Sequence, residues 1–398
     1  MKPVDDFARD AIEYLRAQGE RRPIAFDARQ NALVVGEPPQ HVSFVFLGHA
    51  ETECRQLRPA DRPRALSRRL WSSVRTEASA PQDITRSILP RLRDRAWFSA
   101  VRRQAELELG ADQDAIDDVM LPHRVLNDEL AVHLAFELPT SVTEIGADRL
   151  EVWQRSFDEL LVNALDNLRL RSTEAFERAQ PGVYVSPYRD TFDASRMVLP
   201  ELFASLDVKG APVVLAPTHD ILFVTGDADA NGLVQAATWA EEALMEPRAF
   251  TAVAFRLEHD TWTPWMPPRK HRAWNKLKML RLQTTASAYS RQKEVLEALL
   301  EANGHQISVV PLRAFRTPKG DIFTASAWVE NLDALLPETD RLDFVQAGRT
   351  WSTSFEVARR TVGNLMEPTG DRPERFRVKT FPTLAQLEQM ASEGQLPE

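Results

Sequence analysis

The first part of the chain changes from a helical to a strand-like arrangement of its apolar residues. Apolar side chains recur at helical spacing over residues 4–18, and Gly19 then favours the end of a helix. Three short apolar runs follow at residues 23–26, 32–35 and 41–46, and polar, turn-forming residues separate them. This pattern predicts a helix followed by a three-stranded meander.

The middle of the chain predicts a hairpin, helices and several further strands. Residues 120–145 alternate apolar and polar positions around a turn at Asn127 and Asp128, and residues 150–170 place their apolar side chains on one helical face. Apolar runs at 183–187, 212–216, 221–224 and 250–258 predict strands, and the patterns at 193–206 and 231–245 predict helices.

A proline-rich stretch predicts the start of another module. Pro264, Pro267 and Pro268 fall within five residues, a density that disfavours both helix and central strand. The elements predicted beyond it are helices at 290–303, 353–366 and 384–391, and strands at 306–316, 321–329, 341–346 and 374–380. We therefore expect an α+β protein of several modules, each with an antiparallel or mixed sheet flanked by helices. The expected boundaries are 1–112, which includes an Arg-rich helical segment, then 113–266 and 267–398.

Composition supports a folded protein in a reducing compartment. Of 398 residues, 43% are hydrophobic and 27% are charged, which is ordinary for globular proteins. Cys54 is the only cysteine, so an intrachain disulfide and a thiolate zinc cluster are excluded. The first residues lack the basic end and apolar run of a signal peptide, and no window has the apolar length of a membrane span. We expect a cytoplasmic protein that does not enter a membrane.

Charge is unevenly distributed along the chain. The net charge is -9, yet residues 261–293 carry eight basic and no acidic residues, and residues 55–103 carry thirteen Arg against four acids. The candidate basic surface consists of Arg269, Lys270, Arg272, Lys276 and Lys278. With the interleaved Trp262, Trp265 and Trp274, this stretch could stack on bases and neutralise phosphates. Because the protein as a whole is acidic, we favour internal docking onto acids such as those at 112–118.

The strongest candidate ligand-binding cluster is Asp190, Asp193, Arg196, His219 and Asp220. These residues follow successive predicted strands, so they could meet at one sheet edge and hold a divalent metal that activates water. The alternative is structural: Asp193 caps the helix after it, Arg196 pairs with Asp220, and His219 is a turn residue. We weigh the structural interpretation above the metal site.

Other motifs give weaker signals. Residues 226–232 copy the first half of a calcium loop, but Thr238 stands where the closing Glu is needed, and a strand-to-helix turn capped by Asp229 or Asn231 explains the same residues. His123 and His133 flank the predicted hairpin turn. The common hydrolase, metalloprotease and nucleotide-binding motifs are absent from the sequence. We therefore expect no catalytic residue, metal or cofactor.

Over about residues 120–260 the chain resembles the YtpQ-like family of bacterial proteins, a domain of unknown function. The matching residues are the hairpin strand at 130–137, Trp153 with the run at 163–168, Asp190 with the run at 193–196, and the run at 217–222. The resemblance implies a cytosolic α+β protein with an added C-terminal domain, and it carries over no catalytic residue.

These observations favour a non-enzymatic protein that binds another protein, in the manner of a small adaptor or chaperone domain. A metal-dependent hydrolase using Asp190, Asp193, His219 and Asp220 is the alternative. Nucleic-acid binding through residues 261–293 is the third possibility.

Overall fold

The computed structural model describes residues 6–17, 20–27, 32–35, 43–47, 84–110, 113–138, 141–245, 249–317 and 321–393. Cys54, Asp112 and most of the Arg-rich segment lie outside these ranges. The chain forms two compact units. The first comprises Met1–Leu89, Leu134–Ile145 and Glu151–Asn167, and the second comprises Pro90–His133, Gly146–Leu150 and Leu168–Glu398. The elements make an α+β fold with several antiparallel and mixed sheets.

The first unit contains the predicted N-terminal helix and meander. Helix α1 (Asp6–Ala17) precedes strands β1 (Ile24–Asp27), β2 (Ala32–Val35) and β3 (Ser43–Phe46), which pair antiparallel in chain order. The apolar face of α1 packs on the sheet, where Ala11, Leu15 and Leu33 are fully buried. The predicted helix and meander are therefore confirmed, and the helix packs on the sheet.

Short elements connect the two units along the chain. Helix α5 (Ile84–Ser87) and strand β7 (Ser141–Glu144) belong to the first unit. Strands β4 (Ile88–Asp94) and β6 (Leu130–Leu138) and helices α8 (Ala147–Trp153) and α9 (Phe157–Leu170) have residues in both units. Within the second unit, β5 (His123–Val125) pairs with the start of β6, which confirms the predicted hairpin.

A six-stranded antiparallel sheet forms the centre of the second unit. Its strands are β8 (Glu177–Gln180), β9 (Val183–Val185), β10 (Pro212–Thr218), β11 (Ile221–Gly226), β12 (Ala249–Glu258) and β13 (Thr261–Pro264), in the order β13-β12-β10-β11-β9-β8. Helix α10 (Ala230–Ala243) packs on it through Leu233, Ala236 and Ala240. The 3₁₀ helices η2 (Ala194–Val198) and η3 (Pro200–Phe203) replace the helix expected at 193–206.

The C-terminal part of the second unit contains two four-stranded sheets. One has the order β14-β17-β21-β20, formed by β14 (Ser308–Val309), β17 (Ala334–Pro337), β20 (Glu367–Pro368) and β21 (Arg375–Val378). The other has the order β15-β16-β18-β19, formed by β15 (Arg313–Arg316), β16 (Ile322–Val329), β18 (Arg341–Gln346) and β19 (Arg349–Ser354). Helices α12 (Phe355–Val362) and α13 (Leu384–Glu393) and the 3₁₀ turn η4 (Gly363–Leu365) complete this part. Its core includes Trp328, Phe344, Phe376 and Leu387.

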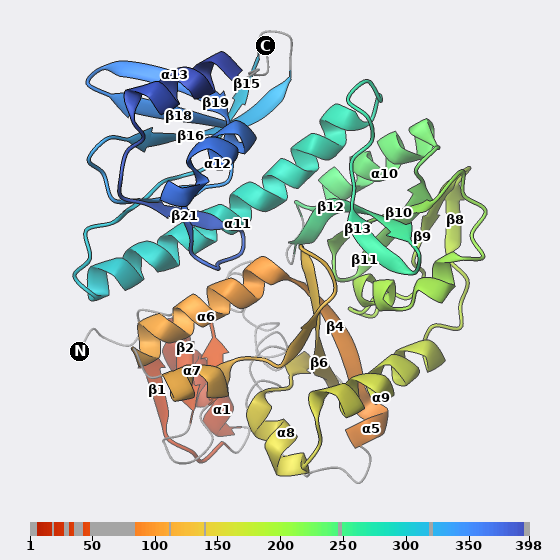
Figure 1. The fold of residues 1–398 in the computed structure, drawn as a ribbon. Coiled ribbons are helices and arrows are strands. Elements are labelled where there is room, and N and C mark those ends of the chain that lie inside the picture. The colour runs from red at the N-terminus through yellow and green to blue at the C-terminus, as the bar shows by residue number, and fades with distance from the viewer. Residues whose placement is uncertain are drawn as a thin grey trace. The chain divides into compact units, whose positions relative to one another are not determined.

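Helix α11 (Trp274–Ala302) joins the central and C-terminal parts, with α6 (Arg95–Leu109) beside it, as Figure 1 shows. The short helix α7 (Gln113–Val119) follows α6. Leu277 and Leu280 of α11 pack in the core of the six-stranded sheet, whereas Leu296 packs with β14 and β17. The expectation of a helix at 290–303 was too short by more than four turns, because basic residues hide the apolar positions of its first half. No helix in the described ranges combines the length and apolar character needed to cross a bilayer.

Both expected domain boundaries, near 112 and 266, fall inside the second unit. Trypsin can test the second one, because Arg269, Lys270 and Arg272 are exposed just before α11. We expect cleavage there to leave two fragments that elute together in native gel filtration, since α11 stays on the C-terminal fragment and packs Leu277 and Leu280 into the six-stranded sheet of the other fragment. A C-terminal fragment that elutes alone would support an independent third module instead.

Candidate functional site

The structure uses Asp190 and Arg196 as a buried ion pair. Both oxygens of Asp190 accept hydrogen bonds from the Arg196 guanidinium, each at 2.8 Å. Arg196 is fully buried, donates to the Ser172 hydroxyl at 3.0 Å, and lies over the Tyr188 ring. Burial raises the pKa of Asp190, but the hydrogen bonds and charge of Arg196 outweigh it, so this pKa is below its usual value. The expected pairing of Arg196 with Asp220 was wrong, because Asp190 lies on the same loop and reaches the guanidinium with both oxygens.

Asp193 stabilises the turn before it and does not cap η2. Its side chain accepts from the Ser186 hydroxyl and, at 3.1 Å each, from the backbone N–H groups of Arg189 and Asp190. The expected helix cap was therefore wrong, since the carboxylate points back along the chain. Burial raises the pKa of Asp193 despite its hydrogen bond from Ser186.

His219 and Asp220 occupy the turn between β10 and β11, as the structural interpretation expected for His219. His219 Nε2 lies 2.9 Å from Arg93 Nη1, and the His219 ring stacks on Phe250. The Asp220 backbone N–H donates to Thr218 Oγ1 at 3.3 Å. Within the described ranges, no three His, Cys, Asp or Glu side chains are grouped to hold a metal ion. Asp190, Asp193 and Arg196 thus bind one another, whereas His219 contacts Arg93 and Phe250.

The segment resembling a calcium loop is a strand-to-helix turn, as predicted. Asp229 is the N-cap of α10 and accepts from the Gly232 N–H at 3.0 Å. Asp227 accepts from the Ala211 N–H at 2.9 Å and from Arg256 at 3.3 Å. His123 and His133 pair across β5 and β6, where they contact Phe98 and Trp97. These residues all have structural contacts.

The basic stretch divides into residues that contact acids of the same unit and residues that face solvent. Lys276 pairs with Glu241 at 3.1 Å, and Lys278 lies 3.5 Å from Asp340. Arg272 donates to the Asn231 side chain at 2.8 Å. These partners differ from the acids expected at 112–118, of which Asp117 pairs with Arg102.

The three tryptophans of this stretch also differ in their surroundings. Trp262 is buried, and its Nε1 donates to the Met197 carbonyl at 2.7 Å. Trp265 packs against the core of the six-stranded sheet. Trp274 begins α11 and lines a groove. Of these three tryptophans, only Trp274 therefore faces a space that a ligand could enter.

That groove is the best candidate site in the second unit. It has a volume of about 800 Å³ and extends along α11 from Trp274 through Lys278, Arg281 and Thr285 to Arg291, with lining residues around most of the helix circumference. Its other walls come from the start of α6, the β5–β6 turn, the start of β12, and the loops around residues 338–340 and 372–374. Sequence-distant segments thus meet around a single helix.

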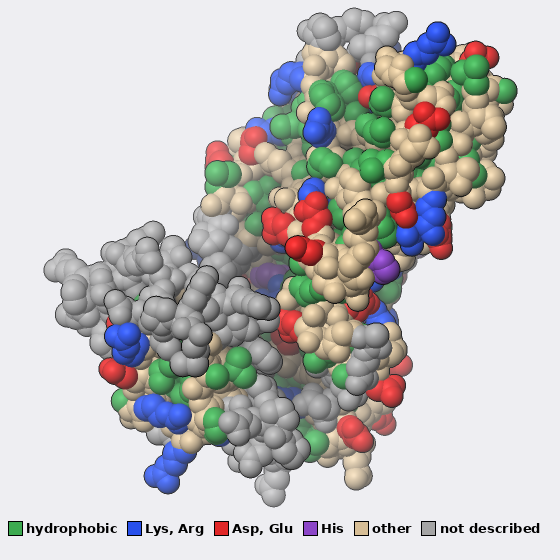
Figure 2. All heavy atoms as spheres, turned by 90° about the vertical axis from the view of Figure 1, so that its left-hand side faces the viewer, with side chains coloured by type: hydrophobic (Ala, Val, Ile, Leu, Met, Phe, Trp, Pro, Cys, Tyr) green, Lys and Arg blue, Asp and Glu red, His purple; other side chains and the backbone are tan. Residues whose placement is uncertain are grey.

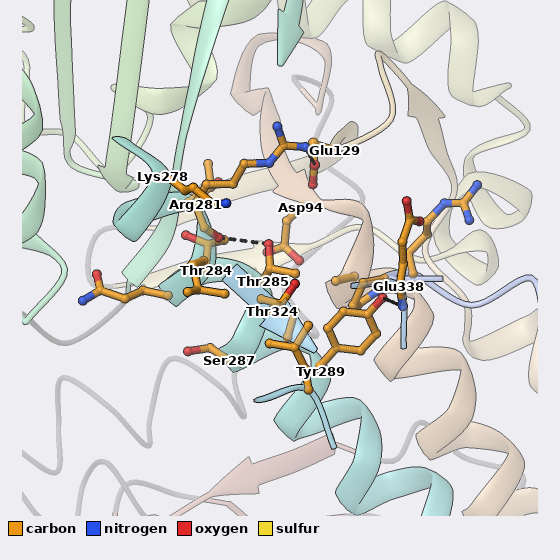
Figure 3. A pocket seen from close by; sticks show the side chains of 18 of the residues that line it. Asp94, Glu129, Lys278, Arg281, Thr284, Thr285, Ser287, Tyr289, Thr324 and Glu338 are labelled. Carbon is orange, nitrogen blue, oxygen red and sulfur yellow. Dashed lines mark hydrogen bonds and ion pairs between the residues drawn. The ribbon is translucent and has the colours of Figure 1, made fainter. Parts of the chain in front are cut away.

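The groove is lined by charges of both signs. The acidic lining residues are Asp94, Asp128, Glu129, Glu338, Asp340 and Glu374, and the basic ones are Arg95, Arg269, Lys278, Arg281, Arg291 and Arg372. Figure 3 shows Arg281 extending toward Glu129, with Asp94 close to the pair, and the closest Arg281–Glu129 approach is 3.5 Å. Among the lining hydroxyl groups, Ser287 is exposed, whereas those of Thr284, Thr285 and Tyr289 donate to the carbonyls of Leu280, Arg281 and Glu374. The lining can therefore bind groups of either charge.

Two groove carboxyls have altered acidity. Burial raises the pKa of Asp94, although the charge of Arg291 and the hydrogen bond from the Trp97 N–H oppose it. Burial also raises the pKa of Glu129. The charge of Arg281 opposes this rise, and the charge of Asp94 adds to it. Perturbed carboxyls inside a groove are typical of functional sites. Sequence reasoning missed both, because nothing local indicates that residues 94 and 129 meet α11.

The surface of the C-terminal elements is mixed in comparison. Figure 2 shows their hydrophobic side chains interspersed with acidic and basic ones. Among the described residues there, the exposed large hydrophobic ones are Phe315, Val329, Leu332 and Leu384, of which Val329 and Leu332 belong to one turn.

Comparison of the chain with protein-family models, curated proteins and solved structures gives no match. The resemblance to the YtpQ-like family therefore stays a prediction.

Proposed function

We propose that the protein is a non-enzymatic binding protein whose groove along α11 takes an extended segment of a partner protein. The observation that carries the proposal is the length of the groove. Its lining runs from Trp274 to Arg291, which is about 26 Å along the helix axis. That length matches about eight residues of extended chain.

The chemistry of the lining supports a polypeptide occupant. An extended segment carries backbone donors and acceptors at every residue, and the groove offers charged side chains of both signs together with the exposed Ser287 hydroxyl. Side chains such as Phe250, Met266 and Trp274 provide apolar contacts among these polar groups. Grooves of this mixed kind suit peptide recognition.

The geometry gives less support to the other two functions. Asp190 already binds Arg196, and Asp193 binds backbone N–H groups, so a metal would have to compete with these hydrogen bonds. The groove lining carries as many acidic as basic residues, so it lacks the net positive charge that binds a nucleic acid. We place the protein in the cytoplasm, as its single cysteine favours, and we keep the YtpQ-like, bacterial assignment as part of the proposal.

A selection from a random peptide library tests the proposal. Ser287 lines the groove and Ser290 does not, although both are exposed on α11, so Ser287→Trp and Ser290→Trp are matched variants. We expect peptides enriched on the unmodified protein to bind Ser287→Trp at least about tenfold more weakly, a loss of about 1.4 kcal/mol, and Ser290→Trp unchanged. Enriched peptides that bind all three proteins equally would exclude the groove as their site.

A further inference from the structure

We propose that the groove recognises an acidic residue next to a large apolar side chain, at the beginning of α11. Arg269 and Lys278 would bind the carboxylate, and Trp274 with Met266 would contact the apolar group. This inference rests on the proposed function and names the class of segment that the groove selects.

Helix geometry brings the recognition residues together. Trp274 and Lys278 are one turn apart on α11, so their side chains are neighbours on the same face. Met266 and Arg269 come from the segment directly before the helix, and all four residues line the groove. The Trp274 N–H donates to the His271 carbonyl at 2.9 Å, which joins that segment to the helix. An apolar surface and two cations therefore lie at the same end of the groove.

The two cations are available to a ligand. Arg269 is exposed, and its side chain has no hydrogen bond or ion pair with the described part of the chain. Lys278 lies 3.5 Å from Asp340, whose same oxygen accepts from the Thr324 N–H at 2.8 Å and the Thr324 hydroxyl at 3.1 Å. Asp340 thus stays hydrogen-bonded when Lys278 turns to an incoming carboxylate, so the exchange leaves no orphaned acid.

The remaining basic candidates differ in position. Lys276 is held by Glu241, Arg272 is bonded to Asn231, and Lys270 faces solvent, and none of the three lines the groove. The sequence shows five equivalent basic residues, whereas the fold directs only Arg269 and Lys278 to the groove. This pairing fits one carboxylate better than a chain of phosphates, because the lining as a whole carries as many acidic as basic residues.

The same peptide selection, repeated on two double variants, tests the inference. Arg269→Gln with Lys278→Gln removes the proposed site, and Lys270→Gln with Lys276→Gln removes the same charge outside the groove. We expect peptides enriched on the unmodified protein to carry Asp or Glu beside Trp, Phe, Leu or Met. Their affinity should fall about tenfold on the first variant and less than about twofold on the second. Trp274→Ala should weaken the same peptides, and circular dichroism should show unchanged folding.

The outcomes separate the two proposals. Peptides that Ser287→Trp blocks but that lack an acidic residue, or ignore the Arg269–Lys278 variant, would overturn this inference and leave the proposed function standing. Peptides insensitive to Ser287→Trp would overturn both. A labelled single-stranded oligonucleotide, tested by anisotropy, is expected not to bind. Binding that the Arg269–Lys278 variant abolishes would make the groove a nucleic-acid site and overturn the acidic-peptide inference.

Discussion

Replacing Asp190 with Ala is expected to lower the free energy of unfolding of the second unit by about 3 kcal/mol, because the Arg196 guanidinium would be left buried without its counter-charge. Arg196 is fully buried, but Asp190 is 26% exposed. The expected loss of stability is therefore at the lower end of the range for breaking a buried ion pair. Urea denaturation followed by circular dichroism measures it. The double variant Asp190→Leu with Arg196→Met should regain much of the loss, since it leaves no charge without a partner. If the double variant loses as much unfolding free energy as the single replacements of Asp190 and Arg196 lose in sum, this account is contradicted.

The same pair predicts a pH dependence with a definite sign. The pKa of Asp190 is lowered in the folded state, so its contribution is present above the unfolded pKa and is lost as pH falls through the folded pKa. The gap in unfolding free energy between the unmodified protein and Asp190→Ala should therefore narrow below about pH 4. A gap that is constant with pH would indicate that the charge of Asp190 contributes nothing.

Much of the fold could be predicted from the local pattern of apolar and polar residues. The meander of the first unit, β10 with β11, and α10 bury residues at the regular spacings that predicted them. Strand β17 was missed because Ala334–Pro337 is a four-residue run buried on both faces, and its partners β14 and β21 come from distant segments. The first half of α11 was missed because its long basic side chains dilute the apolar periodicity.

The candidate groove depends on contacts that no local pattern encodes. The sequence does indicate which residue types meet near residues 190–220, but it predicted Asp220 as the partner of Arg196, whereas Asp190 is the partner. For the groove, Asp94 could be predicted only as a helix cap, and Glu129 only as a residue after a turn. Their position against α11 follows from how the second unit packs. The basic stretch was recognisable, but the choice of Arg269 and Lys278 requires the structure.

Arg375 is expected to be the second residue with a large effect, since it joins α11 to the C-terminal sheets. Its side chain is fully buried and donates to Gln292 Oε1 at 2.6 Å, to the Val310 carbonyl at 2.7 Å and to the Leu335 carbonyl at 3.2 Å. The guanidinium also lies over the Tyr289 ring. Burial lowers the pKa of Arg375 to about 10, which keeps it charged at neutral pH.

Arg375→Met leaves Gln292 Oε1 and the Val310 carbonyl without this donor, whereas the Leu335 carbonyl still accepts from the Val310 N–H. Each unsatisfied buried group costs about 1–3 kcal/mol, so we expect a loss of about 3 kcal/mol in unfolding free energy. Arg377→Met is the matched control on the same strand. It removes only the partly exposed pair with Asp333, which is expected to cost about 0.5 kcal/mol or less. Urea denaturation compares the two variants, and equal losses would contradict the role of Arg375.

The groove should respond as well, because the Tyr289 hydroxyl donates to the Glu374 carbonyl at 2.7 Å and both residues line it. Arg375→Met is therefore expected to speed hydrogen exchange in α11 near Tyr289 and to weaken groove-bound peptides without altering a lining residue.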